Sequence, residues 1–179
     1  MQRLEIKPRE EITVVNVVCT ADLKQSIDIA SFNEYKHLSS NLELYRCGYV
    51  KDDVMRGRVT VFRNGKLISV GTRSIAQAIF ELKKASKILQ KYGLSKAKKI
   101  TPIVRNIVAH CILENSIHLE KLARALPRSM YEPDQFPGII FRIQGSVVAL
   151  IFASGSIIMV GSKSYEELNS TFFELVQRI

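Results

Sequence analysis

The sequence lacks the features that would assign it to a membrane, secreted or metal-binding class. It has no apolar run long enough to span a bilayer, and residues 1–11 show no pattern of a secretory signal peptide. Its cysteines are odd in number and lack the spacing of a zinc site. We interpret them as reduced residues in or near the core of an intracellular protein: Cys19, Cys47 and Cys111.

Acidic residues are missing from one long stretch of the chain. No Asp or Glu occurs between Glu81 and Glu114, whereas basic residues recur there. The net charge of +9 lies in residues 1–99, with 19 basic and 10 acidic residues, while residues 100–179 hold seven of each. This excess favours either a solubilising surface or attraction to an acidic partner, nucleic acid first. The basic residues of the stretch are Lys83, Lys84, Lys87, Lys91, Lys96, Lys98, Lys99 and Arg105.

No constellation of residues indicates catalysis. The three histidines lack the mutual spacing of a metal site or a triad. Glu132 and Asp134 flank Pro133 in an expected loop, where a solvated surface is favoured over acid–base chemistry. Gly65 and Gly71 are explained by a hairpin, not by a phosphate-binding loop. We therefore expect neither an enzyme nor a cofactor.

The chain repeats itself after 90 residues. The positions kept in register are strand apolar residues, turn glycines and serines at helix starts, which indicates a duplicated supersecondary unit. We expect the two repeats to span residues 1–95 and 96–179 and to form one intertwined domain. The matching pairs include Val14 and Val104, Asn16 and Asn106, Val18 and Val108, Phe62 and Phe152, Gly65 and Gly155, Val70 and Val160, and Ser74 and Ser164.

Each repeat predicts the same order of elements: an alternating strand, a short helix, a strand meander and a long helix. Alternation predicts the first strands at 12–20 and 103–111, and short helices follow near 26–36 and 119–126. Gly65 and Gly155 predict tight turns within the meanders, and capping boxes at 74–77 and 164–167 predict the starts of the long helices. The fold class is therefore α+β, an antiparallel sheet with helices on one face.

The sheet face without helices predicts an interaction surface. Strand alternation places one set of mostly apolar side chains on that face in each repeat. An exposed apolar sheet face of this size is typical of a binding surface. The set comprises Asn16, Val18, Thr20, Phe62, Ile68 and Val70 in the first repeat and Asn106, Val108, His110, Phe152, Ile158 and Val160 in the second.

Several motifs resemble a known family. MYEPDQFPGIIFRI at 130–143, LIFASG at 150–155, VGSKS at 160–164 and NIVA at 106–109 are similar to the second repeat of archaeal and eukaryotic TATA-box-binding proteins. The resemblance extends to the first repeat more weakly. It implies a saddle of two pseudo-symmetric halves, with helices on the convex face and a concave sheet that lies in the minor groove of DNA.

The resemblance also implies roles for individual residues in DNA binding. Asn16 and Asn106 match asparagines that donate to base acceptors, and Phe136 and Phe152 match a pair of wedges that unstack a base step. Further positions match groove-facing valines, half of a second wedge pair, and basic residues near phosphates: Val18, Val108, Phe62, Arg73, Arg142 and Lys163. Val70 and Val160 stand where the family has threonines, whose hydroxyls can bond a base acceptor.

The first repeat leaves one wedge position open between two residues. A constant shift of 90 places Arg46 opposite Phe136, and a slip of one residue places Tyr45 there and Lys51 opposite Arg142. Strand alternation favours Arg46 on the open face, with Cys47 and Tyr49 directed inward.

The family resemblance implies a general transcription initiation factor that binds and bends A/T-rich promoter DNA. It also implies a transcription-factor-B-like partner, contacted through Glu132, Asp134, Gln144 and Gly145, with RNA polymerase reached indirectly and no membrane partner. The implied location is the cytoplasm of an archaeal cell, on the nucleoid. Three alternatives stay open: a protein-interaction module with weak or no TATA binding, a sequence-indifferent DNA binder, and a homodimer formed through the concave face.

Overall fold

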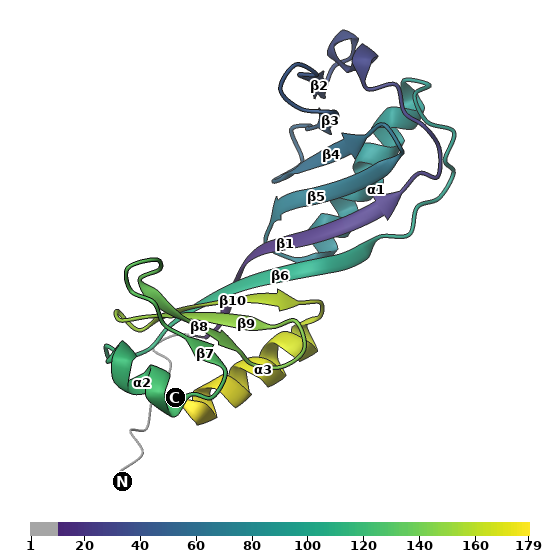
Figure 1. Ribbon diagram of the computed structural model, residues 1–179. Helices are drawn as coiled ribbons and strands as arrows, with labels where there is room; N and C mark the ends of the chain where they lie inside the picture. Colours follow the sequence, from purple (N-terminus) through teal and green to yellow (C-terminus); the bar gives the residue numbers. More distant parts are fainter. Residues whose placement is uncertain (1–10) are drawn as a thin grey trace. The chain divides into compact units, whose positions relative to one another are not determined.

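The computed structural model describes residues 11–179, and these form two compact units (Figure 1). The N-terminal unit comprises residues 16–105, and the C-terminal unit comprises residues 106–179 together with residues 11–15. The expectation of no signal peptide concerns residues that lie, except for Glu11, outside the described range. None of the helices in residues 11–179 combines the length and apolar content that crossing a bilayer requires.

The N-terminal unit is a five-stranded antiparallel sheet with one long helix. Its strands are hydrogen bonded in the order β2-β3-β4-β5-β1. The elements are β1 (Thr13–Asp22), η1 (Ala30–Glu34), β2 (Leu38–Ser40), β3 (Cys47–Val50), β4 (Arg58–Phe62), β5 (Lys66–Thr72) and α1 (Ile75–Lys91).

The C-terminal unit repeats this plan. Its strands are hydrogen bonded in the order β7-β8-β9-β10-β6. The elements are β6 (Ile103–Ile112), α2 (Leu119–Ala125), β7 (Ser129–Met130), β8 (Gly138–Arg142), β9 (Val148–Phe152), β10 (Ser156–Ser162) and α3 (Tyr165–Arg178). The predicted α+β class with antiparallel sheet is confirmed.

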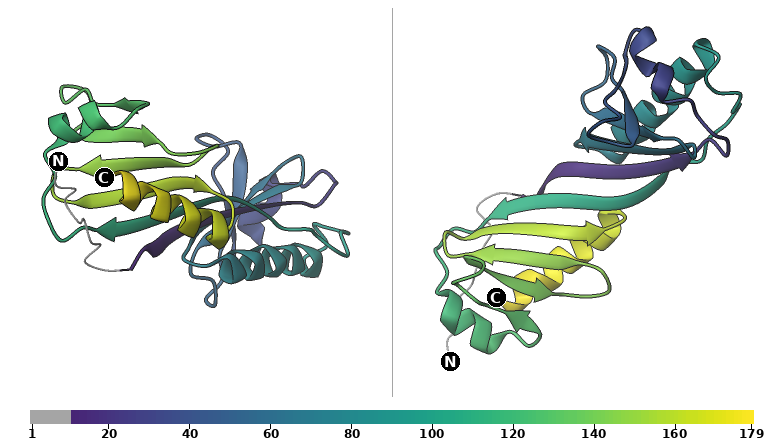
Figure 2. Two further views of the ribbon diagram at one scale, coloured as in Figure 1. Left: turned by 90° about the horizontal axis from the view of Figure 1, so that it is seen from below. Right: turned by 45° about the horizontal axis from the view of Figure 1, so that its top comes forward.

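Each long helix covers one face of its own sheet, and the core lies between the two layers (Figure 2). In the N-terminal unit, Leu82 and Leu89 of α1 are fully buried, as are Val61 and Leu67 of the sheet. Leu168 and Leu175 of α3 close the C-terminal unit in the same way. The alternation of buried and half-exposed residues along the strands therefore defines a helix-covered face and an open face in each unit.

The long helices begin where the serines predict. Ser74 Oγ accepts a hydrogen bond from the Gln77 N–H at 3.2 Å, and Ser164 Oγ accepts one from the Glu167 N–H at 3.1 Å. These are N-cap bonds. In a capping box the Glu167 side chain would accept a hydrogen bond from the N–H of the N-cap residue Ser164. Here a side-chain oxygen of Glu167 accepts instead from the backbone N–H of Lys163, at 2.7 Å.

The helix expected at 26–36 is shorter in the structure. It is a single 3-10 turn at Ala30–Glu34, whereas its counterpart α2 has the predicted extent. The chain has one residue fewer between the buried Phe32 and the left-handed residue His37 than between Leu122 and Arg128. The shorter connection leaves less room for helix before the chain turns into β2.

The segment after α1 packs onto the N-terminal unit. The side chain of Gln25 holds it at two points, by donating to the Leu94 carbonyl at 3.4 Å and accepting from the Lys96 N–H at 3.0 Å. Gln90 of α1 donates to the Ala97 carbonyl. The three cysteines are free and buried, and burial raises the pKa of Cys111 to about 11.

Candidate nucleic-acid interface

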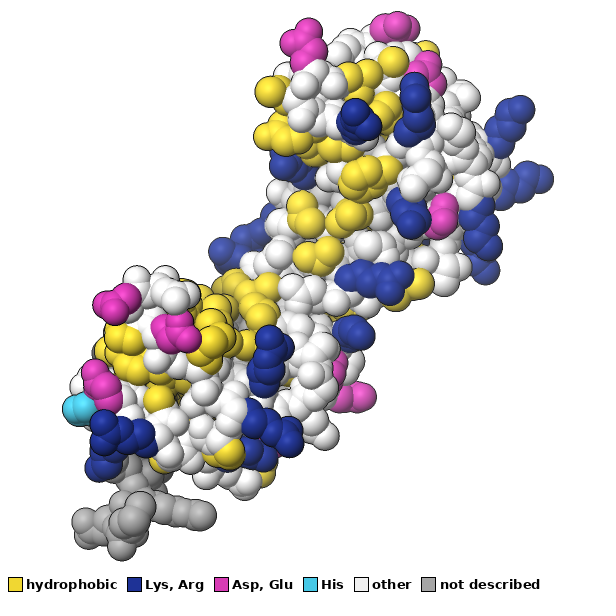
Figure 3. Space-filling model, viewed as in Figure 1, with side chains coloured by type: hydrophobic (Ala, Val, Ile, Leu, Met, Phe, Trp, Pro, Cys, Tyr) yellow, Lys and Arg dark blue, Asp and Glu magenta, His cyan; other side chains and the backbone are white. Residues whose placement is uncertain are grey.

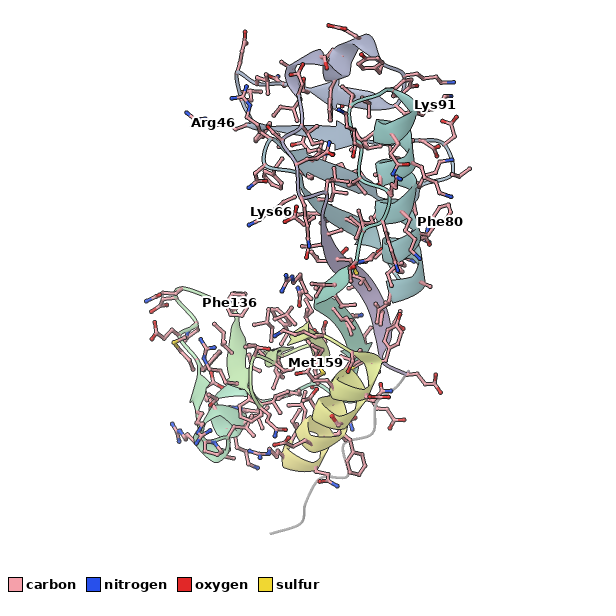
Figure 4. The ribbon with its side chains drawn as sticks, turned by 90° about the vertical axis from the view of Figure 1, so that its right-hand side faces the viewer. Arg46, Lys66, Phe80, Lys91, Phe136 and Met159 are labelled. Atoms are coloured by element: carbon pink, nitrogen blue, oxygen red, sulfur yellow. The ribbon has the colours of Figure 1, made fainter. Side chains whose placement is uncertain are left out.

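The open face of the N-terminal unit carries the residues that strand alternation predicts. Thr20 pairs with Ile68, and Ile68 pairs with Thr60, so these three share one side of the sheet. Figure 4 shows Arg46 and Lys66 on the side away from α1, the helix that carries Phe80 and Lys91. The side chains on this open face are Asn16, Val18, Thr20, Cys47, Tyr49, Arg58, Thr60, Phe62, Ile68 and Val70.

The open face of the C-terminal unit is more apolar. His110 pairs with Ile158, which pairs with Leu150, and the sequence of pairs continues to Ile140. Figure 3 shows hydrophobic side chains gathered over the strands of each unit, with Lys and Arg side chains among and around them. The face comprises Asn106, Val108, His110, Ile140, Arg142, Val148, Leu150, Phe152, Ile158 and Val160.

The two asparagines make the same contact in their respective units. The side-chain oxygen of Asn16 accepts a hydrogen bond from the Gly71 N–H at 3.0 Å, and that of Asn106 accepts one from the Gly161 N–H at 2.7 Å. Each carboxamide nitrogen keeps two donors, and neither donates to any atom of residues 11–179. The arrangement leaves a matched pair of free N–H donors on an otherwise apolar surface.

A bulge beside each asparagine presents the glycine N–H. The pairing of β1 with β5 shifts between Val17 and Cys19, and that of β10 with β6 shifts between Met159 and Ser162. Gly161 has a φ of +104°, and a Cβ there would lie 2.2 Å from the Ser146 carbonyl oxygen. Glycine is therefore required at this bulge, because any side chain would collide with backbone.

Phe136 and Phe152 form a ring pair at one end of the C-terminal face. Their centroids lie 5.7 Å apart with the planes inclined by 60°. Gly138 gives both rings room, since a Cβ on it would lie 3.1 Å from an atom of each. The two predicted wedge residues are therefore together, and both are half-exposed.

The N-terminal unit places Tyr45 at the position of Phe136. Cys47 pairs with Phe62 as Gly138 pairs with Phe152, which is a shift of 91 residues on β3 and of 90 on β4. The Tyr45 N–H donates to the Asn41 carbonyl at 2.8 Å, as the Phe136 N–H donates to Glu132 at 2.9 Å. The alternative with Tyr45 is therefore the structural equivalent of the wedge.

The preference for Arg46 with Cys47 and Tyr49 directed inward is wrong. Cys47 and Tyr49 pair with Phe62 and Thr60, which lie on the open face. The residues that face the core are Gly48 and Val50, because a Cβ on Gly48 would meet the buried Phe32 ring at 2.4 Å. The one-residue slip of the register moves every side chain of β3 to the opposite face.

Most of the predicted basic residues are exposed and unpaired. Arg46, Arg73 and Arg142 are exposed, and no ion pair with any of them occurs within residues 11–179. The side chain of Lys163 is exposed as well. Lys51 is different although it matches Arg142, because its ammonium donates to the carbonyl oxygens of Met55, Arg56 (2.8 Å) and Gly57 (2.7 Å).

The basic residues of α1 are not all free in solvent. Lys87 and Lys91 are exposed, but Lys84 is half-buried and its ammonium lies 3.1 Å from Asp52. Partial burial acts to raise the pKa of Asp52, and the Val54 N–H and the Lys84 ammonium outweigh it and hold that pKa below its usual value. Lys84 therefore forms an ion pair with the loop after β3 and does not point freely into solvent.

The residues predicted for a protein partner lie in two surface loops of the C-terminal unit. Glu132 and Asp134 are exposed in the segment before Phe136. Gln144 and Gly145 are exposed in the turn between β8 and β9, which the Val147 N–H closes by donating to the Gln144 carbonyl at 3.0 Å.

Several residues of the open face were not predicted from the sequence, and Arg58 is a charged one among them. Arg58 begins β4, pairs with Val70 and lies with its guanidinium carbon 4.5 Å from the centroid of the Tyr49 ring. The equivalent position in the C-terminal unit is Val148, which pairs with Val160. The 90-residue shift aligns Arg58 with Val148 in the sequence, but the contact of Arg58 with Tyr49 depends on the register of β3.

The chain is similar to one family over almost its whole length. The model of the family "Transcription factor TFIID (or TATA-binding protein, TBP)" matches residues 11–92 and 101–179. A TATA-box-binding protein of Cenarchaeum symbiosum is 38% identical over 176 residues, 97% of either chain. One of Pyrodictium occultum is 32% identical over 177 residues, 98% of this chain and 87% of the relative. The solved structure of Methanococcus jannaschii TBP matches with a TM-score of 0.80 at 27% identity, covering 94% of this chain and 98% of the other.

Proposed function

Since this chain belongs to the TATA-binding protein family, we propose that it is a general transcription initiation factor that binds A/T-rich promoter DNA. Its open faces lie in the minor groove, with one unit on each half of the DNA site. The observation that carries this proposal is the matched pair of asparagines, which offers free amide donors from the same position of both units. Adenine N3 and thymine O2 are the acceptors on the floor of that groove.

The surrounding side chains supply the other parts of the function. The apolar strands suit a flattened minor groove, because they exclude water from the sugar and base edges. Phe136 and Phe152 insert at a base step and bend the duplex. Arg46, Arg73, Arg142 and Lys163 neutralise phosphates, which adds affinity without sequence preference. In an archaeal cell this places the protein on nucleoid DNA.

A double variant of the asparagines tests the DNA-binding proposal. Asn16→Asp with Asn106→Asp keeps an acceptor for Gly71 and Gly161 but replaces the groove-facing donors by charged acceptors. We expect at least a tenfold loss of affinity for a TATA-containing duplex, measured by fluorescence anisotropy against a scrambled duplex at one salt concentration. Asn169→Asp on the exposed surface of α3 is the matched control. Equal affinity of the wild type for both duplexes would contradict the proposal.

The recruitment of a transcription-factor-B-like protein is the finer part of this proposal. The acidic loop with Glu132 and Asp134 and the turn with Gln144 and Gly145 are exposed and lie outside the strands. RNA polymerase then joins through that partner. Glu132→Arg with Asp134→Arg should leave binary DNA binding intact and abolish the slower band that the partner adds in a gel-shift assay. A retained slower band would place the partner elsewhere.

A second candidate function is a protein-interaction module with little TATA binding. It is favoured by the wedge end of the N-terminal unit, where Tyr45 is 57% exposed and no ring of residues 11–179 stacks on Phe62. A chain that binds the partner but neither binds nor bends a TATA duplex would have this function. In a third state, a second copy of the chain covers the open face and the duplex displaces it. Light scattering with and without DNA distinguishes this state from the other two, because it measures the mass of the particle.

A further inference from the structure

Arg58 is the first residue of β4, the central strand of the N-terminal sheet. β4 lies between β3 and β5, and Arg58 is paired with Val70 on the β5 side. Two residues further along β4, Thr60 pairs with Tyr49 on one side and with Ile68 on the other. The guanidinium therefore lies on the open face, which we propose contacts the base edges of DNA.

Stacking on Tyr49 holds this arginine without satisfying its hydrogen bonds. The guanidinium carbon lies 4.5 Å from the ring centroid, a cation–π contact. Such a stack restricts the long side chain and leaves the N–H groups at the edge of the guanidinium plane free. Arg58 is exposed, and within residues 11–179 it forms neither an ion pair nor a side-chain hydrogen bond.

The C-terminal unit carries its guanidinium one strand further from Val160, on Arg142 of β8, which pairs with Val148, is exposed and stacks on no ring of residues 11–179. Val148 occupies the place of Arg58, and Ile140 occupies the place of Tyr49. Both units carry valine, at Val70 and Val160, on the neighbouring strand, and valine offers no hydrogen bond. The difference is thus a stacked set of donors on the strand next to Val70, whereas the strand next to Val160 carries Val148.

Resting on the proposed function, we propose that Arg58 is a specificity-determining residue that donates to base acceptors of the minor groove in the half-site bound by the N-terminal unit. The acceptors are N3 of adenine and O2 of thymine. A guanine in that groove presents an amino donor, which opposes the guanidinium. Arg58 therefore selects A·T over G·C in one half-site only, and the protein reads its two half-sites with unequal stringency.

The test compares Arg58→Val with matched variants on a set of duplexes. Arg58→Val gives the N-terminal unit the residue of the C-terminal unit, and Arg56→Val removes the same charge from the exposed loop before β4. The duplexes carry A·T to G·C changes, one base pair at a time, on either side of a TATA element. Affinities are measured by fluorescence anisotropy at fixed salt, and thermal melting confirms that each variant folds.

We expect an unequal pattern in the wild type. Changes to G·C should cost about tenfold more affinity in one half-site than at the mirror positions of the other. Arg58→Val should remove that inequality, whereas Arg56→Val should preserve it. Tyr49→Ala removes the stack but keeps the arginine, so it should reduce the difference between the two half-sites without abolishing it.

Three results would overturn the role of Arg58 in specificity, and one of them would also overturn the proposed function. An Arg58→Val variant that loses affinity equally for all duplexes, with a shallower salt dependence, would make Arg58 a phosphate contact. A variant that binds as Arg56→Val does would make the stack a structural element of the sheet. Both leave the proposed function standing. A wild type that does not distinguish TATA from scrambled DNA overturns the proposed function as well.

Discussion

The two units share a helix-covered face and differ in the open face. On the covered side, Val61 and Ile151 are both fully buried, and the N-cap bond of the long helix recurs in each unit. On the open side, the C-terminal unit has the Phe136–Phe152 pair, whereas the N-terminal unit has Tyr45 and a stacked Arg58. Packing density constrains the first set of residues, and only a ligand constrains the second.

The loop between the third and fourth strands differs in length between the two units, and different contacts hold it in each. In the N-terminal unit this loop, 52–57, is one residue longer, and polar side chains hold it: Lys51 donates to its carbonyls and the buried Glu81 accepts from the Gly57 N–H at 2.9 Å. In the C-terminal unit the shorter loop 143–147 buries Val147, and Ser146 donates to Gly161 at 3.1 Å. The longer loop thus needs more polar partners to be fixed.

Replacing the bulge glycines should give the largest effect and the clearest contrast between units. Gly161→Ala adds a Cβ 2.2 Å from a backbone oxygen at a positive φ, while in Gly71→Ala the nearest atom is 3.2 Å away. We expect Gly161→Ala to lower the free energy of unfolding by about 3 kcal/mol and Gly71→Ala by about 1 to 2 kcal/mol. Urea denaturation measures both. Gly145→Ala, with a φ of +56° and no atom within 4 Å of the new Cβ, is the control for strain alone.

The wedge residues should give the next largest contrast, in DNA bending. Phe136→Ala or Phe152→Ala removes the partner of a ring pair, and we expect a loss of about 2 kcal/mol in binding with a smaller bend. Tyr45→Ala should cost less, since Tyr45 has no ring partner in residues 11–179. A fluorescence-transfer assay on end-labelled duplexes reports the bend. Equal losses from Tyr45→Ala and Phe136→Ala would show that the units insert equally.

Restoring threonine on the open face should sharpen specificity by a smaller amount. Val70→Thr and Val160→Thr each add a hydroxyl at the position where the family has one, worth about 1 kcal/mol per net hydrogen bond. We expect the preference for TATA over scrambled DNA to rise more with Val160→Thr, since Arg58 already offers donors beside Val70. The ratio of the two affinities at fixed salt is the readout. A ratio unchanged by both substitutions would mean that neither position faces a base.

The elements and part of the open face could be predicted from the sequence, because both depend on local patterns. Alternation located β1 and β6, serines located the helix starts, and the 90-residue shift placed Asn16 and Asn106 at equivalent positions, all of which the structure shows. The roles of these residues in binding DNA stay predictions. The family resemblance drawn from the second repeat is confirmed over nearly the whole chain.

The register of β3 could not be predicted from a constant shift. One residue is missing before β2 and one is added after β3, so the two differences cancel and the shift of 90 holds on both sides of them. Only the hydrogen-bonded pairs show that Tyr45, not Arg46, matches Phe136. The contact of Arg58 with Tyr49 depends on that register, and the ion pair of Lys84 with Asp52 joins residues that are far apart in the sequence, so no local pattern shows either contact.

The ion pair at the longer loop should give the smallest effect, confined to one unit. The pKa of Asp52 is lowered, so its carboxylate stabilises the fold above the usual carboxyl pKa, and this stabilisation is lost as the pH falls through the lowered pKa. The pair is partly exposed, with Lys84 35% accessible, so Asp52→Asn should cost a few tenths of a kcal/mol at about pH 7 and nothing at about pH 2. Asp53→Asn, at an exposed neighbour, is the control. Hydrogen exchange should show faster opening of loop 52–57 in Asp52→Asn and no change in loop 143–147, where Ile143 takes the place of Asp52. Equal acceleration of both loops would mean that the ion pair stabilises the chain globally and does not hold one loop.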